Sequence, residues 1–262
     1  MDSEKVMKEL RYADAFRSAR NIVNKEGYNI IFMALHGSQN YQLDTEESDF
    51  DWYIAVEPKF NDFVHEDKLV SRTIQYLYGI ITIKDIREMM NMIKKGGFNF
   101  LEILFSQIFY INPRYGKTFS TLINNRNNIA YSNKYATIKS YIGCASNIIG
   151  NGTKDISNKK CAQILTISNH ITSYVTGEPF DNVLTSEKIY SRDFIKNIKS
   201  GTGTKEYLKI LSNVNFDYIH NYGTSYLRNN PDIKIDKESH NIIDNVLYET
   251  CGLLPWISVD NI

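Results

Sequence analysis

One stretch decides the fold: residues 29–56 read NIIFMALHGSQNYQLDTEESDFDWYIAV. It opens with a continuous apolar run, typical of a buried strand, and this run stops at His36-Gly37-Ser38. A polar connector, residues 39–48, separates it from a second apolar run over residues 49–56, which Pro58 ends. We therefore expect two strands, with a Gly-Ser turn after the first and two aspartates at the start of the second.

The two aspartates, Asp49 and Asp51, alternate along the second expected strand, so their side chains project from the same face. Phe50 and Trp52 then project from the opposite face. Two neighbouring carboxylates repel each other unless a cation lies between them, and oxygen ligands suit Mg²⁺ or Mn²⁺. The spacing favours a metal site at Asp49 and Asp51, and the alternative is a solvated edge of a strand.

Gly37 and Ser38 supply the complement to a metal site. A glycine directly after a strand allows a ligand to approach the backbone closely, and its amide and the serine hydroxyl can hold phosphate oxygens. Phosphoryl and nucleotidyl transfer need both a cation and such donors. A serine hydrolase is the less favoured interpretation, because the sequence has no Gly-x-Ser-x-Gly motif.

The remaining chain is expected to be mostly helical. One further strand is expected at residues 74–83, interrupted by Gly79. Helices are expected at residues 3–25, 84–95, 98–109, 115–125, 132–149, 157–175, 191–199, 204–228 and 239–251. The sequence therefore predicts an α+β protein, with a small mixed sheet and flanking helices in residues 1–112 and a helical domain in residues 113–262.

At this point the sequence resembles the DNA polymerase beta-like nucleotidyltransferase superfamily. It is most similar to a group of predicted nucleotidyltransferases of bacteria and phages that has Gly-Ser-x-x-Tyr-Gly-Leu-x-Thr-x-x-Ser-Asp-x-Asp. The matching positions here are Gly37, Ser38, Tyr41, Leu43, Thr45, Ser48, Asp49 and Asp51. A second block, Ile83-Lys84-Asp85-Ile86-Arg87 and then residues 95–106, is also similar to the group.

The resemblance implies a palm-like sheet in which Asp49 and Asp51 are catalytic and bind Mg²⁺ or Mn²⁺. Gly37 and Ser38 would bind a nucleoside triphosphate. A nucleoside monophosphate would then pass to an acceptor on RNA, a protein or a small molecule, with release of pyrophosphate. A toxin-like or antibiotic-modifying transferase would use the same chemistry with a different acceptor.

The chain departs from the superfamily at a third carboxylate, which is expected near Ile80 and is absent there. Asp85 would replace it only if the strand register slipped, and Glu102 is the other candidate. The favoured alternative for Glu102 is a helix acid that caps its helix or pairs with Lys94 or Lys95. The group's glycine after Tyr41 is Gln42 here. These departures motivate a second hypothesis, a catalytically degenerate relative that binds nucleotide or nucleic acid without transfer.

Two further residues are accessory candidates. His36 precedes Gly37 and is placed either to contact phosphate or to bond the backbone at the strand end. Lys95 follows Lys94 at the end of an expected helix, where it would either bind phosphate or complement the helix dipole.

The charge pattern is uneven although the chain is neutral, with 30 Lys+Arg and 30 Asp+Glu in 262 residues. Residues 26–58 carry seven acids and no Lys or Arg, and residues 114–160 carry eight Lys and Arg against Asp155. Neutrality excludes a general polyanion binder. The basic segment is a candidate site for RNA or another polyanion, with Tyr131, Tyr135 and Tyr141 available for stacking; the alternative is solvated lysines and core tyrosines.

Localisation is expected to be cytoplasmic. The three cysteines, Cys144, Cys161 and Cys251, form no CxxC motif, which favours a reducing compartment. No secretory signal is visible, and no apolar run is long enough for a membrane span, so a membrane partner is not expected.

Overall fold

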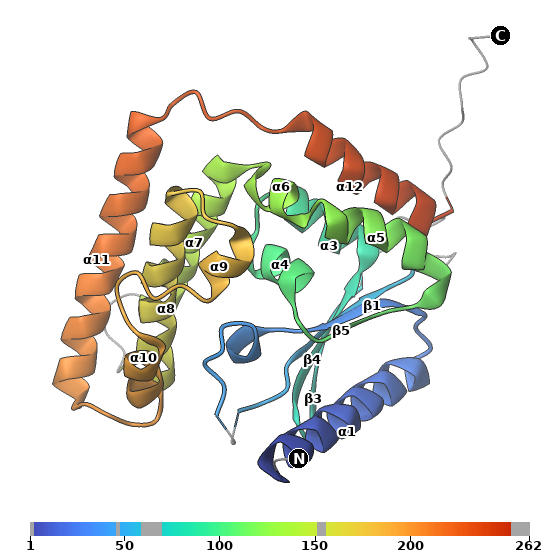
Figure 1. The fold of residues 1–262 in the computed structure, drawn as a ribbon, viewed down its shortest axis with the longest axis horizontal. Coiled ribbons are helices and arrows are strands. Elements are labelled where there is room, and N and C mark those ends of the chain that lie inside the picture. The colour runs from blue at the N-terminus through green and yellow to red at the C-terminus, as the bar shows by residue number, and fades with distance from the viewer. Residues whose placement is uncertain (1–2, 46–47, 59–69, 151–155, 253–262) are drawn as a thin grey trace.

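A computed structural model describes residues 3–45, 48–58, 70–150 and 156–252 of the chain. Its centre is a five-stranded mixed sheet in the order β3-β4-β2-β1-β5. The strands are β1 (Ile30–Leu35), β2 (Trp52–Val56), β3 (Ser71–Tyr76), β4 (Gly79–Asp85) and β5 (Phe109–Ile111). The prediction of a mixed α+β protein is therefore confirmed (Figure 1).

Strand β1 lies antiparallel to β2 and β5, with Leu35 opposite Trp52, while β2 and β4 are parallel, with Trp52 beside Ile81. The single strand expected at residues 74–83 is wrong, because this region is the β3–β4 hairpin. Gly79 explains the error: its φ of +149° is a conformation that glycine adopts readily, so the chain reverses there rather than continuing.

One face of the sheet is covered by α1 (Ser3–Lys25), as Figure 1 shows. The ring of Phe16 lies 5.7 Å from that of Trp52, and Tyr12 lies 4.8 Å from Phe50. Ala19 is fully buried between them and the strands. The predicted helix at residues 3–25 is confirmed, and Phe50 and Trp52 are buried against it.

The opposite face is covered by shorter helices (Figure 1). They are α3 (Ile86–Lys94), α4 (Phe98–Leu101), α5 (Gly116–Asn124) and α6 (Arg126–Tyr131), and α12 (Lys237–Thr250) packs on α3, α5 and α6. The helix expected at residues 98–109 is wrong beyond Leu101, where a 3-10 turn, η2 (Glu102–Phe105), and then β5 follow. Ser106 is the reason, because its hydroxyl donates to the Leu35 carbonyl at 2.7 Å and ties this segment to β1.

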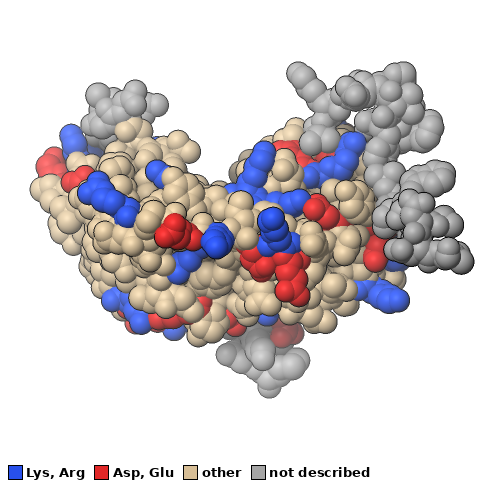
Figure 2. Space-filling model, turned by 90° about the horizontal axis from the view of Figure 1, so that it is seen from above, with Lys and Arg blue, Asp and Glu red and all other residues tan. Residues whose placement is uncertain are grey.

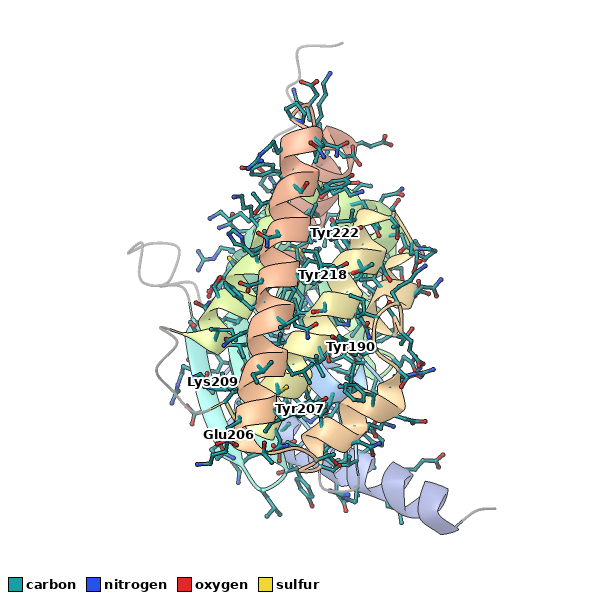
Figure 3. The ribbon with its side chains drawn as sticks, turned by 90° about the vertical axis from the view of Figure 1, so that its left-hand side faces the viewer. Tyr190, Glu206, Tyr207, Lys209, Tyr218 and Tyr222 are labelled. Carbon is teal, nitrogen blue, oxygen red and sulfur yellow. The ribbon has the colours of Figure 1, made fainter. Side chains whose placement is uncertain are left out.

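The other helices stack beside the sheet. They are α7 (Lys134–Ile149), α8 (Asn158–Val175), α9 (Phe180–Leu184), α10 (Arg192–Lys199) and α11 (Lys205–Asn229). Serine or threonine caps begin three of them: the hydroxyls of Ser157, Ser191 and Thr204 accept hydrogen bonds from backbone amides in the first turn. Helix α11 forms the outer surface shown in Figure 3, where Tyr218 and Tyr222 stack at 5.4 Å.

One buried cluster runs from β1 through α3 and α4 into α7 and α8, so the sheet and these helices share a core. Ile31, Leu101 and Ile164 all belong to it. The division of the chain at residue 112 stays a prediction. Among the described residues, no helix is long and apolar enough to cross a membrane.

Candidate functional site

Asp49 and Asp51 directly precede β2, which begins at Trp52 instead of at residue 49 as the sequence predicts. Both are packed over Gly79: a Cβ atom on Gly79 would come within 2.9 Å of Asp51 Oδ1 and 3.1 Å of Asp49 Cβ. Asp51 is half-buried and Asp49 is exposed. The backbone fixes this arrangement, because the Asp51 carbonyl accepts from the His36 N–H at 3.0 Å and the Phe50 N–H donates to the Tyr78 carbonyl at 2.7 Å.

The position expected to hold a third carboxylate lies directly beside Asp51. In the parallel register, Trp52 pairs with Ile81, which places Ile80 next to Asp51. The Ile80 N–H donates to Asp51 Oδ1 at 3.0 Å, while the Ile80 side chain is partly exposed. Over the described ranges, no group of three His, Cys, Asp or Glu residues could hold a metal ion. The site therefore contains the carboxylates of Asp49 and Asp51, with Ile80 at the position expected to hold a third.

The turn after β1 begins with η1 (Gly37–Gln39). Gly37 has a φ of +76° and open space where a Cβ would lie, so its backbone conformation, rather than crowding, requires glycine. The Ser38 carbonyl accepts from the Leu43 N–H at 2.9 Å and closes the turn. This turn stands at the end of β1 that pairs with the start of β2, so Gly37 and Ser38 lie at the same end of the sheet as Asp51.

Glu102 lies beneath this turn and is buried, not on a helix surface. Its carboxylate accepts from the Tyr41 hydroxyl and interacts with the Gly37 backbone N–H. Burial raises the pKa of Glu102 to about 8, and the Gly37 amide offsets part of that rise. The favoured pairing of Glu102 with Lys94 or Lys95 is wrong: Lys94 pairs with Asp244 at 2.8 Å.

His36 lies between Asp51 and Glu102. Its Nδ1 is 3.7 Å from Glu102 Oε1, and its Nε2 is buried without a hydrogen-bond partner among the described residues. Burial lowers the pKa of His36, and the charge of Asp51 opposes that shift. Among the described residues this side chain makes no hydrogen bond to the backbone, and it lies near both Glu102 and Asp51. The phosphate contact stays a prediction.

Two cations of α10 hold the connector that carries the aspartates. Lys199 Nζ donates to the Leu43 carbonyl at 3.0 Å and to Ser48 Oγ at 3.1 Å. Burial lowers the pKa of Lys199, the charge of Lys159 adds to this, and Asp49 is among the acids that oppose it. Arg192 donates to the side chain of Gln42. Helix α10 thus contacts the connector next to Asp49 and Asp51, which we call the carboxylate site.

Tyr41 links the same turn to α8. Its ring meets the ring of His170 edge-on, with centroids 4.9 Å apart. Burial lowers the pKa of His170 to about 4, so this histidine is neutral near pH 7. The Tyr41 hydroxyl bonds Glu102 on one side while its ring packs on His170, which fixes the turn between the sheet and the helices.

Asp85 and Lys95 lie apart from this constellation. Asp85 is fully buried at the other end of β4, caps α3 through the Arg87 N–H at 2.8 Å, and pairs with the Arg87 guanidinium at 2.7 Å. The strand register does not slip, since Asp85 stands beside Val56. Lys95 is exposed at the C-terminal cap of α3, which is the position that the helix-dipole interpretation expects.

Part of the basic segment over residues 114–160 is used within the fold, while its residues 151–155, Lys154 among them, lie outside the described ranges. Arg114 pairs with Glu57 at 3.4 Å, Arg126 donates to the Leu104 carbonyl at 3.3 Å, and Lys134 donates to the Val175 carbonyl at 3.0 Å. Tyr141 is buried and Tyr131 stacks on Tyr174, whereas Tyr135 is exposed. Figure 2 shows basic and acidic side chains intermingled on the face seen from above. An RNA surface here stays a prediction.

No protein-family model matches the chain, and no curated protein matches it either.

Proposed function

We propose that the chain is a divalent-cation-dependent nucleotidyltransferase that moves a nucleoside monophosphate from a nucleoside triphosphate to an acceptor hydroxyl. The observation that carries this proposal is the pair Asp49 and Asp51, packed over Gly79 at the end of the sheet where the Gly37-Ser38 turn lies. Neither carboxylate forms an ion pair within the described ranges, so both remain available to a cation.

The donor set suits Mg²⁺ or Mn²⁺, because Mg²⁺ commonly uses one or two carboxylates and completes its shell with water and substrate phosphates. Asp49 and Asp51 would hold the ion, which when bound neutralises phosphate charge. The Gly37 amide interacts with Glu102, so the Ser38 hydroxyl is the group of this turn left to bind a phosphate oxygen. In the transfer, the acceptor oxygen bonds to the α-phosphorus, pyrophosphate leaves, and the hydroxyl proton passes to solvent.

A further observation supports the resemblance to the nucleotidyltransferase group. Gln42 stands where that group has glycine, and its φ is +58°, a conformation that glycine adopts at little cost. The backbone at Gln42 therefore has the conformation expected for the glycine of that group, although the residue here is glutamine.

The test is transfer from labelled nucleoside triphosphates in the presence of Mg²⁺ or Mn²⁺, with RNA, protein and small-molecule acceptors in separate reactions. We expect metal-dependent transfer by the wild type and a loss of at least about a hundredfold in Asp51→Asn, because the metal ligand is lost. Asp14→Asn, an exposed acid on α1, is the matched control and should retain full activity. Absence of both transfer and metal-dependent nucleotide binding would refute the proposal.

A second candidate function is a nucleotide-binding protein that performs no transfer. It is favoured by Ile80, which lies beside Asp51 where the superfamily has a carboxylate. If this alternative holds, the wild type binds nucleotide with metal but transfers nothing, and Ile80→Asp gains transfer. Leu77→Asp, on the exposed turn of the same hairpin, is the control for the added charge.

A further inference from the structure

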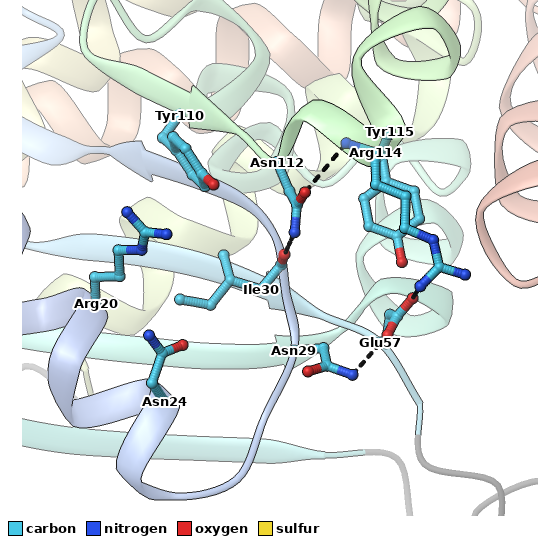
Figure 4. Close-up of a pocket in the computed structure, with 9 residues that line it drawn as sticks. All are labelled: Arg20, Asn24, Asn29, Ile30, Glu57, Tyr110, Asn112, Arg114 and Tyr115. Carbon is cyan, nitrogen blue, oxygen red and sulfur yellow. Dashed lines mark hydrogen bonds and ion pairs between the residues drawn. The ribbon is translucent and has the colours of Figure 1, made fainter.

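A polar cavity of about 230 Å³ lies at the opposite end of the sheet from Asp49 and Asp51 (Figure 4). Its lining comes from the end of α1, the start of β1, the end of β2 and the segment around β5. Along β1 the two sites are separated by residues 30–35, which at about 3.3 Å per residue is roughly 17 Å. The cavity is therefore distinct from the carboxylate site.

The charges around the cavity leave one cation uncompensated. The Glu57 carboxylate is already bound by Asn29 Nδ2 at 2.9 Å and by Arg114 Nη1 at 3.4 Å. The Arg20 guanidinium lies 5.2 Å from the centre of the Tyr110 ring and makes no ion pair within the described ranges. Two guanidinium groups against one carboxylate make the lining positive, so an anion fits it better than a cation.

Uncharged donors accompany the guanidinium groups. Tyr115 is only 5% exposed, and its hydroxyl has no hydrogen-bond partner among the described residues. A buried hydroxyl without a partner is costly, so it marks a place where a ligand oxygen would be stabilising. Figure 4 shows that the side chains of Arg20 and Asn24 both extend from α1 toward the cavity.

We propose that this cavity binds a phosphate group, held by Arg20 with Asn24, Arg114 and the Tyr115 hydroxyl as further donors. Guanidinium groups match phosphate oxygens in charge and geometry, and the room exceeds that of a single water several times over. The source of the phosphate is inorganic phosphate or the 5′-phosphate of a mononucleotide. The proposal does not rest on nucleotidyl transfer, because no group of the carboxylate site takes part.

The test is calorimetric titration of the full chain with inorganic phosphate, with AMP and with adenosine, at constant ionic strength and with chelator to remove divalent cations. We expect saturable binding of a phosphate-bearing ligand and no binding of adenosine. Arg20→Gln should weaken this binding at least about tenfold, since it removes a charged hydrogen-bond donor. Arg17→Gln is the matched control: it lies one turn away on α1, is 70% exposed, and should change the affinity less than twofold.

Two more variants separate this site from the rest of the molecule. Tyr115→Phe keeps the ring and removes an unpaired hydroxyl, so it should fold as well as the wild type and still weaken phosphate binding. Asp51→Asn should bind phosphate as the wild type does. The proposal is overturned if neither phosphate nor AMP binds, if adenosine binds as well as AMP, or if Arg20→Gln and Arg17→Gln behave alike.

Discussion

At one end of the β1–β2 pair, Asp49 and Asp51 face solvent over Gly79, with no ion pair among the described residues. At the other end, Glu57 and Asp85 follow and flank the same strands, and each is bound by an arginine. All four are carboxylates, yet Glu57 and Asp85 are each neutralised by an arginine, whereas Asp51 accepts only the Ile80 N–H and Asp49 has no ion pair among the described residues. A carboxylate that the fold already neutralises contributes to stability, whereas one without a cationic partner is available to a ligand.

The largest expected effect tests this contrast directly. Asp85→Ala removes a fully buried carboxylate that pairs with the Arg87 guanidinium and caps α3, so we expect a loss of about 3–5 kcal/mol in the free energy of unfolding. Asp51→Asn should change that free energy by less than about 1 kcal/mol, because its amide oxygen can still accept from the Ile80 N–H. Urea denaturation followed by circular dichroism measures both.

The proposed difference between the two ends is refuted if Asp51→Asn destabilises the protein as much as Asp85→Ala does. That result would make Asp51 a structural acid like Asp85, and the argument for an available carboxylate site would fail. Asp14→Asn, on the exposed surface of α1, gives the baseline for removing an acid outside both ends of the sheet.

The carboxylate end was predictable from sequence because its parts are close along the chain. A strand, a Gly-Ser turn and two alternating aspartates lie within residues 29–51, and strand alternation alone places Asp49 and Asp51 on one face. The same alternation places Phe50 and Trp52 on the other face, and both are buried in the structure. Local periodicity is sufficient where the residues of a site share one segment.

The supporting contacts were not predictable, because their partners are far apart in sequence. Lys199 meets Ser48 across 151 positions, and no pattern near either residue indicates the contact. The sequence predicts a helix acid at Glu102 because the apolar run around it resembles a helix, whereas the helix ends at Leu101 and the chain continues through a 3-10 turn into β5. The cavity at the other end draws Arg20, Glu57 and Tyr115 from separate elements, so no motif encodes it.

The second prediction concerns pH at the carboxylate end. Glu102 has a pKa of about 8 in the folded protein, above the ordinary value of 4.5, so the folded state holds a proton that the unfolded state has lost. The stability contributed by this group is full below about pH 4.5 and is lost as pH rises towards 8. Glu102→Gln, which resembles the protonated acid, should lack this loss. Relative to the wild type, it should gain at least about 1 kcal/mol between pH 5 and pH 8.

Urea denaturation at several pH values measures this difference, and Glu9→Gln on the exposed surface of α1 is the control. The comparison of wild type with variant also cancels the titration of the histidines other than His36, whose Nδ1 lies 3.7 Å from Glu102 Oε1. A pH-independent difference between the wild type and Glu102→Gln would mean that the carboxyl is ionised in the folded state. In that case the Gly37 amide would interact with a charged Glu102 carboxylate instead of a neutral carboxylic acid.

The smallest expected effect tests whether the backbone at Gln42, in the turn near Asp49 and Asp51, is strained. Gln42 has a φ of +58°, which costs a non-glycine residue about 1 kcal/mol, and its side chain accepts from Arg192 of α10. Gln42→Gly and Gln42→Ala both lose the bond to Arg192, so their difference isolates the backbone. Gly should be more stable than Ala by up to about 1 kcal/mol, because the greater freedom of glycine in the unfolded chain offsets part of the relief. Equal stabilities would show that the turn relaxes when Arg192 is released, and hence that α10 imposes the conformation; a clear advantage for Gly would show that the turn itself requires it.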